Sequence, residues 1–366
     1  MTFDYALLKR LCETPGVPSR EEQIREVVRE AMQPLVDEVR VDGLGNLIGV
    51  RHGRPGTSNA SRGTGARPRR IMIAAHMDEI GFLVRHVDKH GFLRIQPVGG
   101  FDPKVLVAQR VIVTTSAGEA LHGVLFPGGA KPPHLMSPGQ DPKPPKLEDF
   151  FVDVGLSGDQ AREAVEVGDM VTLDRSVERT GNHIIGKCMD DRAGVFVMLE
   201  ALRAVRAHEV EIVAVATTQE EVGLRGAGTA AFGVEPDVGI ALDGTLAVDL
   251  PGIEEQDYVS ELGKGVGIKV MDSSSISDPR LVRQFKDLAR RESIPFQMEV
   301  MPRGGTDAGA IQRTRAGVPA ITLSVPTRYV HTCNEMVNEK DLQAAISLLA
   351  RYLEEAHTFD YSFTAS

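Results

Sequence analysis

The chain is poor in cysteine, carries no excess of positive charge and has no hydrophobic run long enough to cross a membrane. Its three cysteines, Cys12, Cys188 and Cys333, form no CxxC pair and no even-numbered framework, so we expect a reduced, intracellular protein. A net charge of -10 argues against a nucleic-acid-binding protein, which usually has a basic face. The first residues lack a basic segment followed by an apolar stretch, so we expect no signal peptide, no membrane contact and a cytoplasmic location.

The chain does contain enough apolar residues for a sizeable core, because 42% of its 366 residues are hydrophobic. Ser19 with Glu22 three residues later predicts a capping box at the start of a helix. Strand and helix patterns alternate along most of the chain, but residues 82–172 hold short strands separated by Gly and Pro turns. We therefore predict an α/β fold in which a β-rich domain of residues 82–172 is inserted into a discontinuous domain of residues 1–81 and 173–366.

Residues 51–70 interrupt a predicted hairpin with six arginines, four glycines and no acidic residue. Such a segment is expected to be a mobile surface loop. A basic loop could also contact a nucleic acid or an acidic partner, but an insertion tolerated in a hairpin is the simpler interpretation.

Polar side chains follow three predicted strands at the point where each strand ends. His76 and Asp78 follow an apolar run, Glu220 and Glu221 follow a second, and Asp243 follows a third. If these strands share a parallel sheet, their carboxyl ends meet at one edge, where ligands bind in open α/β sheets. Two further clusters, Asp190-Asp191 and the segment around His331, add another imidazole and more carboxylates.

This set of side chains suits a two-metal hydrolase. Zinc-like ions take imidazole nitrogen and carboxylate oxygen, and two ions about 3.5–4 Å apart can share one carboxylate and one water. The shared charge gives a bridging hydroxide near neutral pH, and a carboxylate that is not a ligand can accept its proton. The Glu220-Glu221 pair offers one ligand and one base, and the Asp190-Asp191 pair offers a bridge and a supporting neighbour.

Each cluster also has a plainer interpretation. A histidine after a strand is often structural, adjacent glutamates are often solvated, and Asp243-Gly244 is typical of a turn. Cys188 and Cys333 lie close to Asp190 and His331 in the sequence and could approach a metal, although small buried cysteines beside a site explain them more simply. The Gly-rich segment 304–309 has no Lys-Ser/Thr after it, so we expect it to approach a bound substrate closely rather than bind phosphate.

Six motifs strengthen the two-metal interpretation because they occur together and in order. They are AHMDEIGF (75–82), GKCMDDRAGV (186–195), TTQEEVGLRGA (217–227), ALDGT (241–245), GGTDAGAI (304–311) and RYVHTCNEM (328–336). From about residue 5 to 356 the chain resembles the tetrahedral (TET) aminopeptidases of metallopeptidase family 42, a family that includes glutamyl aminopeptidases and proteins once labelled endoglucanases. Two departures are the long Arg-rich segment and Cys188, which stands where a small apolar residue is common.

The resemblance implies a role for each residue of the candidate site. The implied metal ligands are His76, Asp190, Glu221, Asp243 and His331. Asp190 would bridge two divalent ions, most simply zinc, with cobalt or manganese as alternatives. His76 and Asp243 would complete one set of ligands, and Glu221 and His331 the other.

Three more carboxylates receive roles from the same resemblance. Glu220 would be the general base, and Asp78 would orient His76 from behind. Asp191 would follow Asp190 across a cis peptide bond.

The resemblance also implies architecture and assembly. The larger domain would be a mixed-sheet, zinc-exopeptidase-like catalytic domain, and residues 82–172 would be a PDZ-like dimerisation domain. Dimers would assemble into a hollow tetrahedral dodecamer that admits unfolded peptides.

We therefore predict a co-catalytic di-metal aminopeptidase that acts on peptides and associates with itself. Three alternatives stay open: another two-metal amide hydrolase such as a deacylase or dipeptidase, a glycoside hydrolase that uses two carboxylates without metal, and a non-catalytic assembly protein.

Overall fold

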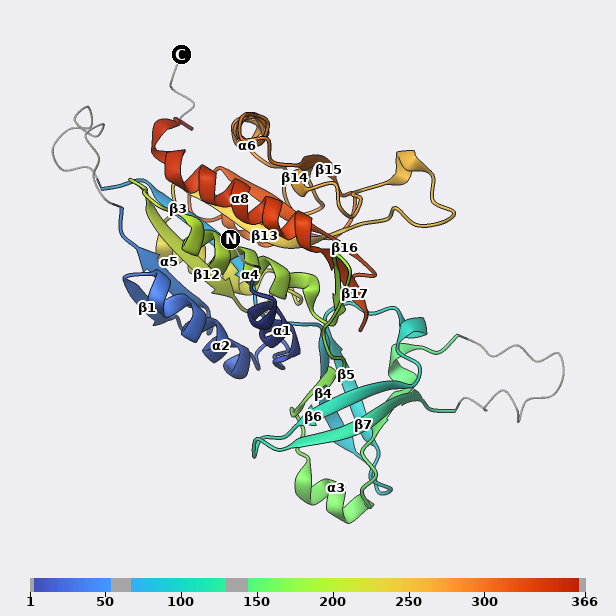
Figure 1. Ribbon diagram of the computed structural model, residues 1–366. Helices are drawn as coiled ribbons and strands as arrows, with labels where there is room; N and C mark the ends of the chain where they lie inside the picture. Colours follow the sequence, from blue (N-terminus) through green and yellow to red (C-terminus); the bar gives the residue numbers. More distant parts are fainter. Residues whose placement is uncertain (1–2, 54–66, 130–143, 362–366) are drawn as a thin grey trace.

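A computed structural model describes residues 3–53, 67–129 and 144–361 of the chain (Figure 1). In these residues the strands form one 11-stranded sheet and one closed six-stranded barrel. The sheet strands are β1 (Glu38–Val41), β2 (Leu47–Arg51), β3 (Arg70–His76), β10 (Glu178–Thr180), β11 (His183–Gly186), β12 (Glu211–Thr217), β13 (Val238–Leu246), β14 (Val266–Met271), β15 (Phe296–Val300), β16 (Ala320–Arg328) and β17 (Glu335–Asn338). The barrel strands are β4 (Gly81–Val87), β5 (Leu93–Val98), β6 (Gln109–Thr114), β7 (Ala120–Pro127), β8 (Phe150–Asp153) and β9 (Met170–Leu173).

The sheet is mixed, with a parallel centre and antiparallel margins. Its order is β1-β2-β12-β3-β13-β16-β17-β11-β10, and β14 and β15 extend from β16. The neighbours β12, β3, β13 and β16 run parallel to one another. Parallel strands are buried on both faces, which explains why these segments read as continuous apolar runs.

Eight helices of the described residues pack against the sheet or the barrel. They are α1 (Tyr5–Glu13), α2 (Glu22–Met32), α3 (Gly158–Ala164), α4 (Met189–Ala204), α5 (Arg225–Val234), α6 (Pro279–Arg291), α7 (Asp307–Gln312) and α8 (Glu339–Glu355). Alternate residues of β3 show how both faces are covered: Ile71 and Ile73 pack in the core with α1, α2, α4 and α8, whereas Met72 and Ala74 pack with α5 and Ile311 of α7.

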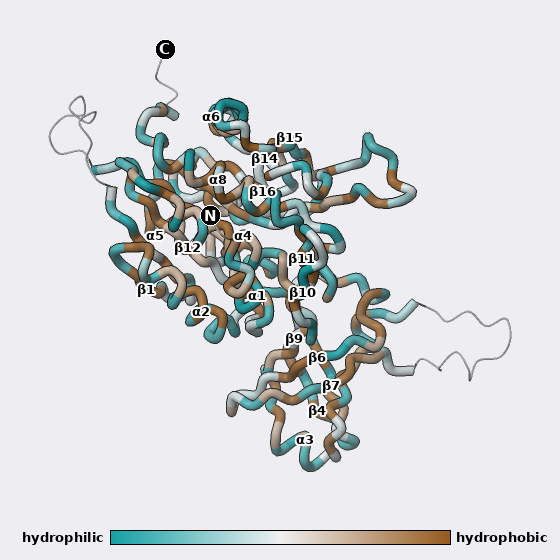
Figure 2. The backbone as a smooth tube through the Cα atoms, in the orientation of Figure 1, coloured by the Kyte–Doolittle hydropathy of each residue, from teal (hydrophilic) through white to brown (hydrophobic). Residues whose placement is uncertain are grey.

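Helix α6 lies at the margin and is amphipathic. Figure 2 colours most of it hydrophilic, while Leu281, Phe285 and Leu288 are buried against the main core. Their spacing of three or four residues places them on one helical face.

The barrel strands all lie between Gly81 and Leu173, and the barrel has its own apolar core, which includes Phe82 and Val152. Its first strand begins five residues after the end of β3, so the barrel is joined to the chain beside the candidate site (Figure 1). The mixed α/β fold with a small β-rich body agrees with the sequence prediction. The proposed domain division at residues 82 and 172 stays a prediction.

Two details of the sequence prediction are wrong. Ser19 does not cap a helix, because its φ is 71° and α2 begins at Glu22 without a side-chain cap. Asp243 lies inside β13 rather than after it. Residues 54–66, which make up much of the Arg-rich segment, lie outside the described residues, and so do residues 130–143. Within the described part of the chain, none of the helices is both long and apolar enough to span a bilayer.

Candidate active site

The sheet register brings the candidate residues to one edge. Thr217 of β12 pairs with His76 of β3, and Ala241 of β13 pairs with Ala74 of β3. Asp243 and His76 each come two residues after that second pair, so they lie at the same level of the sheet. The pairing of three parallel strands therefore gathers an imidazole and a carboxylate at their carboxyl ends, as the strand pattern predicts.

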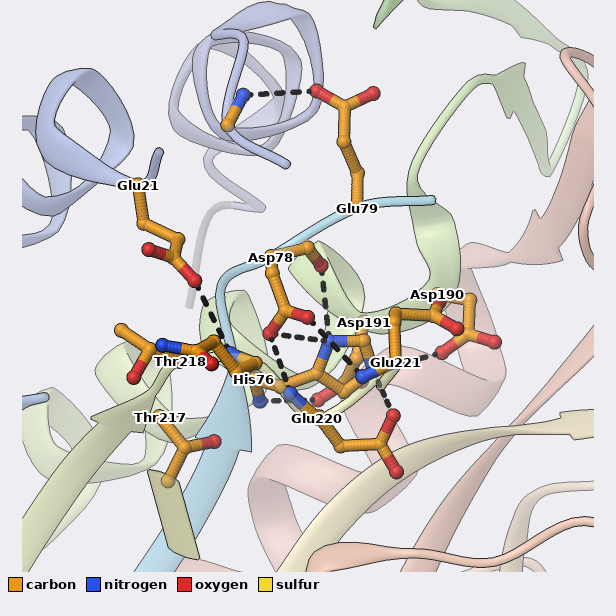
Figure 3. Close-up of polar contacts among 12 residues, drawn as sticks. Glu21, His76, Asp78, Glu79, Asp190, Asp191, Thr217, Thr218, Glu220 and Glu221 are labelled. Atoms are coloured by element: carbon orange, nitrogen blue, oxygen red, sulfur yellow. Dashed lines mark hydrogen bonds and ion pairs between the residues drawn. The ribbon is translucent and has the colours of Figure 1, made fainter. Parts of the chain in front are cut away.

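Asp190 stands between the two candidate histidines. Its Oδ1 is 3.2 Å from His76 Nε2, and its Oδ2 is 3.6 Å from His331 Nε2. Glu221 Oε2 lies 3.5 Å from the same nitrogen of His331, and Glu220 Oε2 lies 3.8 Å from His76 Nε2. Figure 3 shows the Asp190, His76, Glu220 and Glu221 side chains converging from three separate segments.

Among the residues that the structure describes, two groups of side chains have ligand atoms close enough to one another to hold an ion. In the first, atoms of His76, Asp190 and Glu221 lie within 4.8 Å of one another. In the second, atoms of Asp190, Asp191 and Asp243 do so. Asp190 belongs to both groups, as a bridging ligand must. These groups differ from the two predicted sets of ligands, because Glu221 lies with His76 and Asp191 lies with Asp243. The roles of the individual ligands therefore stay predictions.

Asp78 contacts both His76, which the resemblance implies it orients, and the glutamate pair. His76 Nδ1 lies 3.0 Å from the backbone carbonyl oxygen of Asp78 and 3.6 Å from its carboxylate. The two carboxylate oxygens instead accept the backbone N–H groups of Glu220 and Glu221, at 3.0 and 3.1 Å (Figure 3). Asp78 thus positions His76 through its backbone and the glutamate pair through its side chain.

The turn that carries the glutamates is held by further side-chain acceptors. Asn46 Oδ1 accepts the N–H of Thr218 at 3.0 Å, and Glu21 Oε1 accepts the N–H of Gln219 at 3.1 Å. Together with Asp78, they satisfy four consecutive backbone donors, which a tight turn cannot pair internally. Glu21 and Asn46 are both buried, and the sequence analysis did not identify either.

Glu335 is a third residue of the site that was not predicted from the sequence. Its Oε2 accepts the N–H of Asp190 at 3.0 Å, and its Oε1 accepts the N–H of His331 at 2.8 Å. One buried carboxylate therefore holds the backbones of two candidate ligands that are far apart in sequence. The only available signal was its place in the last of the six motifs.

Asp191 supports the same region from the other side. The peptide bond between Asp190 and Asp191 is cis, as the resemblance implies. The Asp191 carboxylate accepts the N–H of His76 at 3.2 Å and that of Gly194 at 3.0 Å.

Comparisons with known proteins agree with this geometry. A family model described as M42 glutamyl aminopeptidase matches residues 56–348. The chain is 38% identical to a lysyl aminopeptidase from Pyrococcus furiosus, with 98% of this chain and 99% of that protein covered. The chain belongs to the M42 glutamyl aminopeptidase family.

Solved structures lead to the same family. An aminopeptidase from the archaeon Desulfurococcus kamchatkensis superposes with a TM-score of 0.90 at 37% identity, covering 99% of this chain and 98% of that one. The Pyrococcus horikoshii TET1 peptidase, which can assemble into a tetrahedron or a large octahedral shell, superposes with a TM-score of 0.81 at 32% identity, covering 96% and 99%. These matches confirm the family predicted from the six motifs. Membership of this family supports an aminopeptidase that hydrolyses peptides.

The electrostatics of this M42 site suit divalent cations. Burial, with Asp190 and Asp191 nearby, raises the pKa of Asp243 well above its usual value, and one oxygen of that carboxylate is buried without a hydrogen-bond partner. Burial opposes protonation of His331, but Asp190 and Glu221 raise its pKa to about 11. So many buried carboxylates need neutralising charge, which divalent ions supply. The residues present therefore fit the metals that an M42 peptidase implies.

The cysteines near the M42 site have other partners. Cys188 is buried with its Sγ 2.8 Å from Glu79 Oε2, and Glu79 in turn pairs with Lys187. Cys333 packs in the barrel core. Neither cysteine is in the two ligand groups, which favours the plainer interpretation of both.

Proposed function

We propose that this M42 peptidase removes N-terminal residues from peptides with two divalent ions, held by His76, Asp190, Glu221, Asp243 and His331. The observation that carries the proposal is the position of Asp190, whose carboxylate belongs to both ligand groups. Two ions bound by these residues would supply positive charge that polarises the peptide carbonyl and lowers the pKa of the attacking water. Zinc suits these nitrogen and oxygen donors, and cobalt or manganese would also fit.

Glu220 is the proposed general base. Burial raises the pKa of its carboxyl well above the usual value, and the neighbouring Glu221 adds to that effect while His76 opposes it. A carboxyl with a raised pKa can accept a proton from the attacking water and donate it to the leaving amine. The backbone of Glu220 is fixed by Asp78, so its side chain starts from a defined position beside His76.

The barrel is the proposed PDZ-like dimerisation domain, inserted into a zinc-exopeptidase-like catalytic domain. None of the proposed catalytic residues or metal ligands lies in the barrel strands. Since the similar TET1 peptidase of P. horikoshii forms closed shells, we propose that dimers of this chain assemble into a dodecamer. A cytoplasmic location also stays a prediction.

A substrate panel tests the proposed activity. Matched peptides with free and N-acetylated N-termini should separate an aminopeptidase from a deacylase, since only the free peptides should be shortened from that end. A set of dipeptides and longer peptides separates it from a dipeptidase. Loss of activity with a chelator and its return with added metal would be expected. Hydrolysis of glycosides that survives the chelator would instead support a metal-free glycosidase.

The name of the family does not determine the preferred N-terminal residue. The family model is described as a glutamyl aminopeptidase, whereas the P. furiosus relative is named a lysyl aminopeptidase. Those residues carry opposite charges, so the preference of this chain depends on its own pocket.

A further inference from the structure

A cavity of about 340 Å³ opens beside the proposed metal ligands. One end is formed by the carboxylates and the imidazole of the site. The other end is lined by Leu224, Thr245, Leu246, Met301, Gly304 and Gly305. Leu246 is 39% exposed and Leu224 is half-buried, so among the described residues part of the apolar surface at this end stays open to solvent. A side chain of the bound substrate can cover it.

Two charged residues, Lys269 and Glu299, lie near the apolar end of the cavity but are not part of its lining. Lys269 and Glu299 are both fully buried and form an ion pair. Thr245 Oγ1 donates a hydrogen bond of 2.5 Å to the same Glu299 oxygen. Met301 stands in front, with its Sδ 3.9 Å from Lys269 Nζ and 3.8 Å from Thr245 Oγ1. A substrate side chain therefore meets the Met301 thioether, because Lys269 and Glu299 are fully buried and neither lines the cavity. The second carboxylate oxygen of Glu299 has no hydrogen-bond partner, but it lies on the side of Gly267 and not in the lining.

Two glycines in the lining at the same end pack closely against neighbouring side chains. Gly304 has a φ of +84°, and a Cβ at this position would lie 3.2 Å from Met301 Cε. A Cβ at Gly305 would lie 2.9 Å from Ser274 Cβ. Backbone without side chains thus lines this part of the pocket, and Met301 is the large side chain that lies against it.

We propose that this end of the cavity receives an uncharged, apolar side chain of the N-terminal residue, such as leucine or methionine, and that Met301 determines its depth. The inference rests on the proposed aminopeptidase function and names the substrate class. A glutamate or lysine side chain would lose its hydration against Leu224, Leu246 and Met301 without gaining an opposite charge. Arg303 is adjacent in sequence to Gly304, but its side chain is exposed and is not part of the lining.

The first test uses the metal-loaded wild-type protein and p-nitroanilides of methionine, leucine, lysine and glutamate. Methionine, lysine and glutamate have unbranched side chains, so they compare charge at similar shape. We expect kcat/KM for the methionyl and leucyl compounds to exceed both charged ones by about tenfold or more. A preference for the glutamyl or lysyl compound would overturn the inference and leave the aminopeptidase function intact. If the protein hydrolyses none of the four compounds and shortens no peptide with a free N-terminus, the proposed function itself is refuted.

Two substitutions test the wall directly, and Met298 provides the control because it is 42% exposed on β15 and outside the lining. Leu246→Lys places a cation in an exposed part of the lining and should raise the glutamyl-to-leucyl ratio of kcat/KM about tenfold, whereas Met298→Lys should leave it unchanged. Met301→Ala deepens the proposed pocket, so it should raise the ratio of kcat/KM for the phenylalanyl compound to that for the leucyl compound by about tenfold. Met298→Ala should leave this ratio unchanged. Unchanged ratios in folded Leu246→Lys and Met301→Ala would contradict the proposed pocket. If Met301→Ala does not fold, the Leu246→Lys result decides.

Discussion

Glu220 and Glu221 are neighbours in the chain, but their side chains have different partners. Glu220 Oε2 lies 3.8 Å from His76, whereas Glu221 Oε2 lies 3.5 Å from His331 and belongs to a ligand group. We expect Glu220→Gln to keep bound metal and lower kcat by about a hundredfold or more, because the base is lost and the volume is kept. Glu221→Ala should lose metal and activity together.

Metal content and steady-state rates of both variants, measured on the same preparations, check this assignment. Near-normal activity of Glu220→Gln would remove it as the base. Loss of metal from Glu220→Gln together with full metal content in Glu221→Ala would mean that the two roles are reversed.

The residues predicted from sequence and those that were missed differ in how they contribute. His76, Asp190 and Glu221 could be proposed as ligands because they belong to motifs that place metal-ligand residue types after predicted strands. Glu21, Asn46 and Glu335 instead contribute by accepting backbone N–H groups from distant segments. A sequence shows which side chains can accept hydrogen bonds, but it does not show which backbone donors the tertiary fold brings to them.

Glu21 provides a test of this positioning role. Glu21→Ala removes the acceptor for the N–H of Gln219, next to the proposed base, and should lower kcat about tenfold with little change in KM. Glu21→Gln keeps an acceptor oxygen and should restore most of the rate. Equal rates for the two variants, in protein with the same metal content and melting temperature, would exclude a positioning role.

At the level of elements, Arg192 of α4 ties the N-terminal segment to the site. Its fully buried guanidinium donates to the carbonyl oxygens of Leu11, Thr14 and Gly16. Arg192→Ala should lower the free energy of unfolding by about 3 kcal/mol or more, because buried acceptors lose their donors. Arg203 is the control.

Arg203 is on the same helix but is 44% exposed and pairs with Glu200. Arg203→Ala should cost no more than about 1 kcal/mol. Urea unfolding of the two variants measures both values, and equal losses would show that the buried contacts of Arg192 contribute little.

Apolar runs predicted the strands that precede the site residues, because these parallel strands are buried on both faces. The prediction was less accurate where local and tertiary preferences conflict. Cys188, at φ 60°, precedes α4, and Asp190 and Asp191 depart from helical φ and ψ angles near its start, so the first residues of this element are not a regular helix. Asp243 continues β13 because β16 pairs with it, at the register Asp243 to Ser324. Neither feature follows from local propensity.

For the whole molecule, we expect self-association. Light scattering on the metal-loaded protein should give a mass many times that of the 39.6 kDa chain, near twelve chains if closed shells form. We expect the barrel to provide the contact between chains, because it has its own apolar core and contains none of the proposed catalytic residues. A persistent monomer at micromolar concentration would contradict both the dimerisation role and the dodecamer.

The central claim, that two ions act together in each chain, is tested most directly by metal titration. Chelated protein is loaded stepwise with zinc or cobalt, and ions bound per chain are measured alongside hydrolysis of a leucyl or methionyl p-nitroanilide. Since Asp190 belongs to both ligand groups, we predict that activity reaches its maximum only near two ions per chain. Full activity with one ion bound and no second ion accepted, or full activity in the chelated protein, would contradict the account.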